Sequence, residues 1–165
     1  MLGVNLIRLK KDLLITLMIV IVGSLIGYVF VSDNMQPNLH KNVDLKIEQI
    51  WNHNIGIILL IIFWGIITFG LLSCIILFIN GLSFGIVMAN LSHHMILFVL
   101  VPYATLELSA FLVASLMSFS VSRKIKQALC SRQIGYLYKN LGHEKLFLAI
   151  IFILLGLSAI LEVYL

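Results

Sequence analysis

Glu107 is the residue whose type and surroundings point most directly to chemistry. It is the single charged side chain between Tyr103 and Val121, a stretch that otherwise consists of apolar and small polar residues. A carboxylate inside a membrane-spanning helix costs about 2.5–3.5 kcal/mol on insertion scales. Such residues usually face the protein interior and mark a function or a polar network. The alternative is structural, in which Glu107 braces the backbone near Pro102.

A second candidate centre is the segment Gly81-Leu82-Ser83-Phe84-Gly85, which matches the G-x-S-x-G pattern of serine hydrolases. His93, His94 and Glu107 follow it, so a serine–histidine–acid set can be drawn with Ser83 as the nucleophile. That motif requires a strand, a sharp turn and a helix, whereas here a turn leads into an apolar helix. The two glycines also form a GxxxG packing pattern. The context therefore favours a protein without enzymatic activity, although a catalytic Ser83 stays open.

The histidines do not form a metal-binding pattern. His93 and His94 are adjacent, so their side chains would diverge by about 100° on a helix, and the sequence contains no H-E-x-x-H. His40 and His53 lie in a polar segment and could meet a metal only through tertiary folding. No Walker A or dinucleotide-binding motif occurs either. We expect neither a metal nor another cofactor.

The elements that must position these residues are membrane-spanning helices. Of the 165 residues, 61% are hydrophobic and only 11% are charged. Soluble domains contain roughly 25% charged residues, so this composition suits hydrocarbon and not water. The length leaves little room for anything beyond four or five spans of about 20 residues each. We predict an all-α, polytopic membrane protein that forms a single membrane domain.

Four long apolar runs and one interrupted run give the predicted spans, at residues 13–31, 55–79, 82–101, 103–121 and 146–164. A turn at Asn80-Gly81 is expected to separate the second span from the third. Asn90, Ser92 and the two following histidines interrupt the third, so the segment near 82–102 is either one broken span or a pair of re-entrant helices. It should face the protein interior, since unsatisfied backbone is not tolerated against lipid.

Two polar segments connect these spans. Segment 32–54 contains Ile47, Ile50 and Trp51, whose spacing favours a short helix lying in the membrane interface. Segment 122–145 is a basic loop with six Lys and Arg residues, whereas three precede the first span and two lie in 32–54. The positive-inside rule therefore predicts that the N-terminus and the basic loop are cytoplasmic, in a multi-pass protein of the cell membrane. Because the basic residues flank apolar runs, the net charge of +4 indicates orientation and not nucleic-acid binding.

Small residues at helical spacing predict where helices pack. Gly23 and Gly27 form a GxxxG pattern in the first span. Ala110, Ala114 and Ser118 recur every four residues in the fourth. Small residues allow helix backbones to approach closely in membranes, so both faces are expected to contact other helices and to hold partner subunits.

Several motifs follow one another along the chain: Asn52-His53-Asn54, then Gly65 and Gly70, then Asn80-Gly81 with Gly85, and finally Pro102-Tyr103-Ala104-x-x-Glu107-x-x-Ala110. In this order they resemble the motifs of the stage II sporulation protein M family. The resemblance covers roughly residues 51–122. Asn80, Gly81 and Glu107 carry over directly as site residues, with Gly85 and Pro102 beside them. Tyr103 stands where the family often has histidine, and Ala104 where it has glycine.

This resemblance implies membrane scaffolding or accessory work. One branch of the family acts in spore engulfment, within a peptidoglycan-remodelling complex. Short members accompany gene clusters for circular bacteriocins, where they are linked to peptide maturation, export and immunity, and this short chain is more similar to them. The implied partners are the lipid bilayer, other membrane proteins such as an ATP-driven exporter, and a hydrophobic peptide. Two further hypotheses are an intramembrane serine hydrolase and a small carrier with Glu107 as its proton or ion site.

Overall fold

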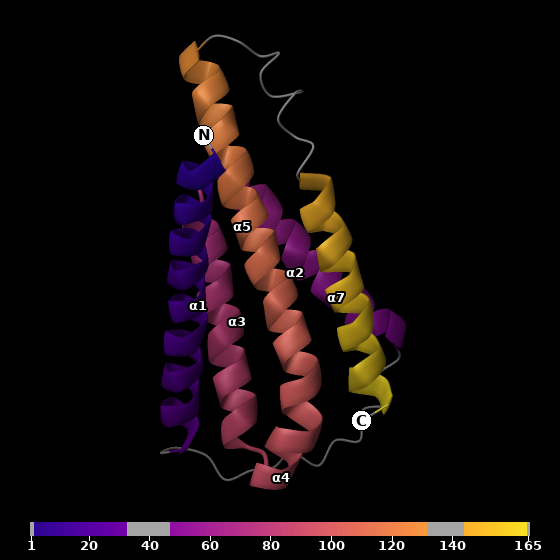
Figure 1. The fold of residues 1–165 in the computed structure, drawn as a ribbon. Coiled ribbons are helices and arrows are strands. Elements are labelled where there is room, and N and C mark those ends of the chain that lie inside the picture. The colour runs from indigo at the N-terminus through magenta and orange to yellow at the C-terminus, as the bar shows by residue number, and fades with distance from the viewer. Residues whose placement is uncertain (1, 33–46, 132–143, 165) are drawn as a thin grey trace.

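The protein is a bundle of helices, shown in Figure 1 as a computed structural model that describes residues 2–32, 47–131 and 144–164. In chain order the elements are α1 Leu2–Ser32, α2 Ile47–Ile67, α3 Leu71–Ala89, the short α4 His93–Met95, the π-helix η1 Ile96–Leu100, α5 Val101–Ser131 and α7 Glu144–Tyr164. No strand occurs within these residues. The prediction of an all-helical protein is confirmed.

Five of the helices, α1, α2, α3, α5 and α7, are long and apolar enough to cross a membrane. Helices α1, α3 and α7 run in one direction and α2 and α5 run in the other (Figure 1). The start of α1, the α2–α3 turn and the end of α5 therefore lie at one end of the bundle, and α4 and the C-terminus lie at the opposite end. Five crossings agree with the predicted four to five.

The chain reverses at Thr68–Gly70, within the apolar run that was predicted to be a single span. Phe69 and Gly70 both have positive φ, of 54° and 99°. Gly70 is required here because an added Cβ would lie 2.0 Å from the Phe119 ring. No polar residue other than Thr68 marks this turn, so hydropathy alone gave no signal for it.

The turn predicted at Asn80-Gly81 is wrong, because both residues lie inside α3. The Asn80 side chain donates a hydrogen bond to the Ile76 carbonyl, with an N–O distance of 2.8 Å. This bond satisfies the side-chain amide of Asn80 within the helix, so the helix can continue through this residue. Helices α2 and α3 therefore replace the expected spans 55–79 and 82–101.

The predicted break near His93 exists, but it connects two long helices at the end of the bundle and does not interrupt a span. Helix α3 ends at Ala89, and the chain continues through α4 and η1 into α5. The π-helical turn ends at Leu100, two residues before Pro102, whose missing N–H cannot close an α-helical hydrogen bond to Phe98. Pro102 thus accounts for the irregular start of α5.

The two predicted connectors are shorter than expected. Residues from Ile47 onward begin α2, so Ile50 and Trp51 belong to a long helix and not to a separate interfacial one. Trp51 packs against Phe152 of α7, with ring centroids 6.4 Å apart. Helix α5 continues to Ser131 and takes up the start of the predicted basic loop. The remainder of both connectors lies outside the described residues.

Glycines bring α1 and α3 into backbone contact. A Cβ added at Gly27 would lie 2.2 Å from the Leu82 carbonyl oxygen, and one at Gly85 would lie 2.0 Å from the Ser24 carbonyl oxygen. Gly23 and Gly81 are similarly close to backbone atoms of the facing helix. Two GxxxG patterns therefore pack against each other inside this chain.

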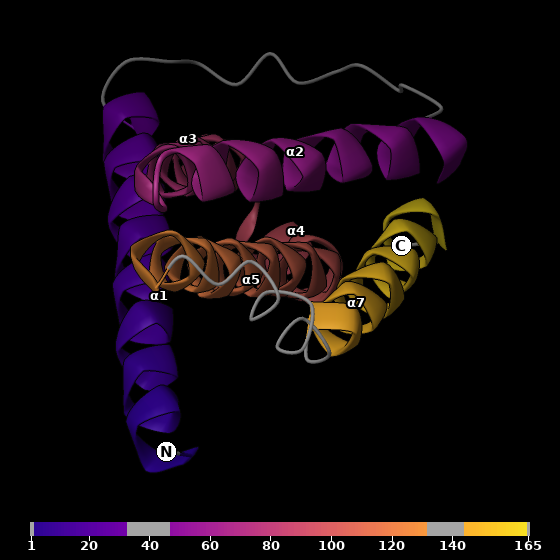
Figure 2. The same ribbon diagram turned by 90° about the horizontal axis from the view of Figure 1, so that it is seen from above.

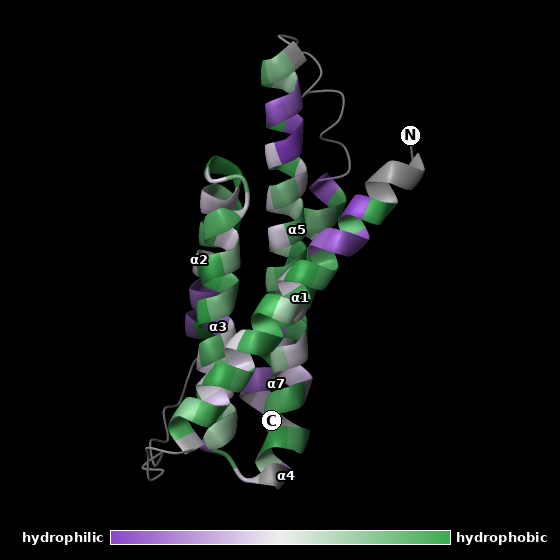
Figure 3. Ribbon diagram, turned by 90° about the vertical axis from the view of Figure 1, so that its left-hand side faces the viewer, coloured by the Kyte–Doolittle hydropathy of each residue, from purple (hydrophilic) through white to green (hydrophobic). Residues whose placement is uncertain are grey.

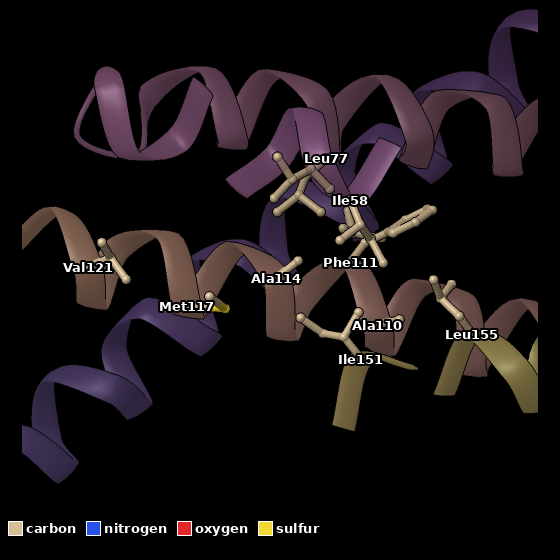
Figure 4. Packing of buried hydrophobic residues seen from close by; sticks show 11 residues of the cluster. Ile58, Leu77, Ala110, Phe111, Ala114, Met117, Val121, Ile151 and Leu155 are labelled. Carbon is tan, nitrogen blue, oxygen red and sulfur yellow. The ribbon is translucent and has the colours of Figure 1, made fainter. Parts of the chain in front are cut away.

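Helix α5 is the centre of the bundle and contacts all four other long helices (Figure 2). Ala110, Phe111 and Ala114 of α5 are buried against residues of α2, α3 and α7, as Figure 4 shows. A hydrogen bond of 3.0 Å joins the hydroxyl groups of Ser73 in α3 and Ser115 in α5. The small residues of α5 thus pack within the chain.

Replacing Gly85 by alanine should destabilise the bundle by about 1–3 kcal/mol, since the methyl group overpacks a backbone contact. Gly56→Ala is the matched control, because an added Cβ at Gly56 meets no atom within 4 Å. The control should be neutral or stabilising by about 0.5–1 kcal/mol through helix propensity. Unfolding in detergent, followed by circular dichroism, measures both. Equal stability of the two variants would contradict the α1–α3 contact.

Candidate functional site

A partly open cavity of about 230 Å³ lies between α2, α3, α5 and α7. Leu100 and Phe111 form part of its apolar wall. Its polar lining comes from all four helices, and consists of His53, Asn80, Ser83, Tyr103, Glu107 and Glu162. The structure therefore brings four of the predicted site residues together and adds His53 and Glu162.

The two carboxylates are positioned by the contact between α5 and α7. The Ser158 hydroxyl of α7 donates to the Tyr103 carbonyl of α5, with an O–O distance of 3.0 Å. Glu107 and Glu162 each follow these residues by four positions, which is about 6 Å along a helix. Because the two helices are antiparallel, Glu107 and Glu162 lie on opposite sides of this bond, and both line the cavity.

Neither carboxylate has an ion pair or hydrogen bond with another described residue. The groups close enough to act on them electrostatically are each other and, for Glu162, His53 of α2. All described Lys and Arg residues lie on the opposite half of the bundle, in the first turns of α1 and α7 and the last turns of α5. The cavity is therefore acidic, and its carboxylates remain available to a ligand.

Asn80 and Ser83 face the cavity from α3 but use part of their hydrogen-bonding capacity within the helix. Ser83 donates to the Ile79 carbonyl at 3.1 Å, and Asn80 donates to Ile76. An asparagine amide has a second N–H and an acceptor oxygen. Asn80 can thus still contact a ligand, while the Ser83 proton is already engaged.

The arrangement does not reproduce a hydrolase site. Ser83 lies in the middle of a continuous helix, where backbone N–H groups are committed to helical bonds and cannot form an oxyanion hole. His94 stacks on Phe98, with ring centroids 4.6 Å apart, and does not line the cavity. His93 begins α4, at the end of the bundle.

The cavity also differs from a metal centre. No group of three His, Cys, Asp or Glu side chains among the described residues is placed to hold one ion. His53, Glu107 and Glu162 line a common space without converging on a point. A positively charged organic group, which needs only charge and hydrogen-bond acceptors, fits this lining better.

The sequence did not single out His53 or Glu162 as site residues. Glu162 ends the last apolar run, a position that indicates the membrane interface and not a site within a span. His53 lies in a motif of the family resemblance, but no sequence spacing relates α2 to α7. The one available signal was that both are ionisable residues at the margin of an apolar run. Gly81 and Gly85 were expected at the site and instead face α1.

Five long apolar helices, four of which line the acidic cavity, define a polytopic integral membrane protein. The family model described as Stage II sporulation protein M matches residues 16–165, so the chain belongs to that family. An uncharacterized protein of Methanocaldococcus jannaschii is 26% identical over 168 residues, which cover 94% of each chain. No solved structure matches the chain. The predicted family membership is confirmed.

A double-mutant cycle tests whether Glu107 and Glu162 share one site. In alkaline buffer, Glu107→Gln and Glu162→Gln each remove the same repulsion, so their effects on unfolding free energy should differ from additivity by at least about 0.5 kcal/mol. The control pairs Glu107→Gln with Glu48→Gln, because Glu48 is exposed on α2 and does not line the cavity. Detergent unfolding of the variants is the measurement. Additive effects in both cycles would mean that the two carboxylates do not interact, and would contradict a shared site.

Proposed function

We propose that this protein is a non-enzymatic membrane accessory protein, which assists the maturation, export or immunity of a small hydrophobic peptide of the circular-bacteriocin type. Family membership supports a membrane protein of this general kind. The observation that carries the proposal is the partly open cavity with two carboxylates that form no ion pair or hydrogen bond with a described residue. Intramembrane ionisable residues of this kind are functional-site hypotheses by default.

The cavity suits a hydrophobic peptide that carries a positive charge. Part of its wall is apolar, and the carboxylates of Glu107 and Glu162 would accept hydrogen bonds from a lysine or N-terminal ammonium group. Charge-assisted hydrogen bonds of this type are about twice as strong as neutral ones. Tyr103 and Asn80 would add neutral hydrogen bonds at the same wall. A peptide could be held in this way while its apolar side chains remain in lipid.

The glycine faces were expected to hold partner proteins, and the structure corrects this part of the hypothesis. Gly23 and Gly27 pack against the backbone of α3, and Ala110 and Ala114 are buried in the core. Contacts with an exporter or another membrane protein would instead use the lipid-facing surfaces, which carry exposed side chains such as Phe63 and Leu59. A subunit of a sporulation engulfment complex remains the alternative, since such a scaffold would use the same surfaces.

Glu107→Ala should abolish peptide-dependent immunity or release in the native host, whereas Ser83→Ala should leave it intact. The reason is that Glu107 supplies an uncommitted charge and Ser83 an engaged hydroxyl. The assay compares cells that express each variant at equal membrane levels. Loss of function in the serine variant with retention in the glutamate variant would reject the proposal and favour a hydrolase.

Crosslinking provides an independent test of peptide contact. A photoreactive residue at Phe84, which lines the cavity, should capture the peptide, and one at Phe63, which is exposed on the surface of α2, should not. Capture at Phe84 should disappear in Glu107→Ala. Equal capture at both positions would indicate a general membrane contact and not this cavity.

A small carrier is the second candidate, because two carboxylates in one membrane cavity also suit a proton or cation. Purified protein in sealed vesicles would then conduct protons or monovalent cations, and Glu107→Gln would reduce the flux at least tenfold. The first proposal expects vesicles that stay as tight as protein-free ones. A pH-sensitive or ion-sensitive dye inside the vesicles distinguishes the two functions.

A further inference from the structure

A second cavity, of about 330 Å³, lies at the opposite end of the bundle from the acidic site. Its walls come from α1, the α2–α3 turn and α5. The apolar lining is formed by Ile15, Phe69 and Phe119, and the polar lining by Asp12, Ser122, Arg123 and Lys126. The volume lies at the lower end of ligand pockets, which span roughly 300–1,000 Å³. It can hold a headgroup but not a whole lipid.

This end of the bundle is strongly basic. Seven described Lys and Arg residues lie there against two acidic residues, Asp12 and Glu144, which leaves an excess of five positive charges. Figure 3 shows the hydrophilic bands of α1 and α5 at this end, above the apolar body of the helices. Arg123 forms an ion pair with Asp12, and Lys124 forms one with Glu144. Both carboxylates are thereby engaged by other cations, so Lys126 adds positive charge to the cavity.

Two cationic side chains line the cavity, Arg123 and Lys126, and they supply two kinds of hydrogen-bond donor. The structure records one guanidinium nitrogen of Arg123 on Asp12, and a guanidinium has five N–H donors in all. The Lys126 ammonium contributes three more. Together they match the several acceptor oxygens of a phosphate group better than those of a single carboxylate.

The remaining walls are apolar and continue into the lipid-facing surface. Phe69 is 61% exposed at the turn, and Ile15 is 43% exposed on the body of α1. The ring of Phe119 packs against Gly70, which fixes this wall in place. A ligand with a phosphate beside Lys126 would therefore have hydrocarbon contacts directly below it.

We propose that the cavity between α1, the α2–α3 turn and α5 binds the headgroup of an anionic phospholipid. Arg123 and Lys126 bind the phosphate, and Ile15 and Phe69 contact the start of the acyl chains. Basic pockets between membrane helices are known to suit such headgroups. The shared chemistry also fits free phosphate, but only a lipid uses the apolar walls. This site is independent of the acidic cavity and of the peptide function.

Native mass spectrometry of the detergent-purified full chain tests the assignment with phosphatidylglycerol, phosphatidylcholine and inorganic phosphate. Wild-type protein should retain one phosphatidylglycerol in preference to phosphatidylcholine. Lys126→Gln should weaken this binding about fivefold, which corresponds to about 1 kcal/mol per basic residue at a membrane surface, and Lys126→Arg should preserve it. Displacement of the lipid by millimolar phosphate would overturn the lipid assignment.

The matched control is Lys145→Gln, which removes the same charge from the same end but from a residue of α7 that does not line the cavity. It should retain the lipid at the wild-type level. Equal weakening in Lys126→Gln and Lys145→Gln would mean diffuse electrostatic attraction and would overturn the site. Circular dichroism of each variant verifies that the helices are intact, and Lys126→Arg keeps the test decisive if the glutamine variant does not fold.

Discussion

The backbone contact between α1 and α3 is the interaction on which the rest of the structure depends. Helices in lipid gain no hydrophobic free energy by associating, so they depend on close packing and on satisfied polar groups. Gly27 and Gly85 permit an approach that any side chain would prevent. This contact fixes the rotation of α3 about its axis. The face of α3 that carries Asn80 and Phe84 is thereby directed at the cavity.

The same constraint explains why a G-x-S-x-G sequence occurs without a nucleophile elbow. Residues 81 and 85 are four positions apart and share one face of the helix, whereas residue 83 is displaced by about 200° from residue 81. The glycines meet α1, and Ser83 is left on the cavity side with its proton donated to Ile79. Helix packing accounts for the glycines, and helical backbone bonding accounts for the serine.

The sequence predicted the membrane class and the helical fold, because these follow from local composition. It did not predict the reversal at Thr68–Gly70, since apolar residues flank the turn on both sides and its geometry depends on positive φ at Phe69 and Gly70. It predicted a turn at Asn80, because a residue pattern does not reveal that the Ile76 carbonyl accepts a hydrogen bond from this side chain within the helix. His53 and Glu162 join Glu107 only through the packing of α2 and α7 on α5, which no local spacing encodes.

The position of the acidic cavity favours a binding role over conduction. The cavity is built from the first turns of α2 and α5, the second half of α3 and the last turn of α7, so it belongs to the half of the bundle away from the basic end. Phe111, which is 1% exposed, lines the cavity and also belongs to the buried cluster with Ile61 and Leu77, both 0% exposed. Beyond this cluster the basic residues of α5 would repel a cation. A carrier would have to separate these tightly packed helices at every cycle, whereas a protein that holds a cationic group within its acidic half can keep the glycine contact closed.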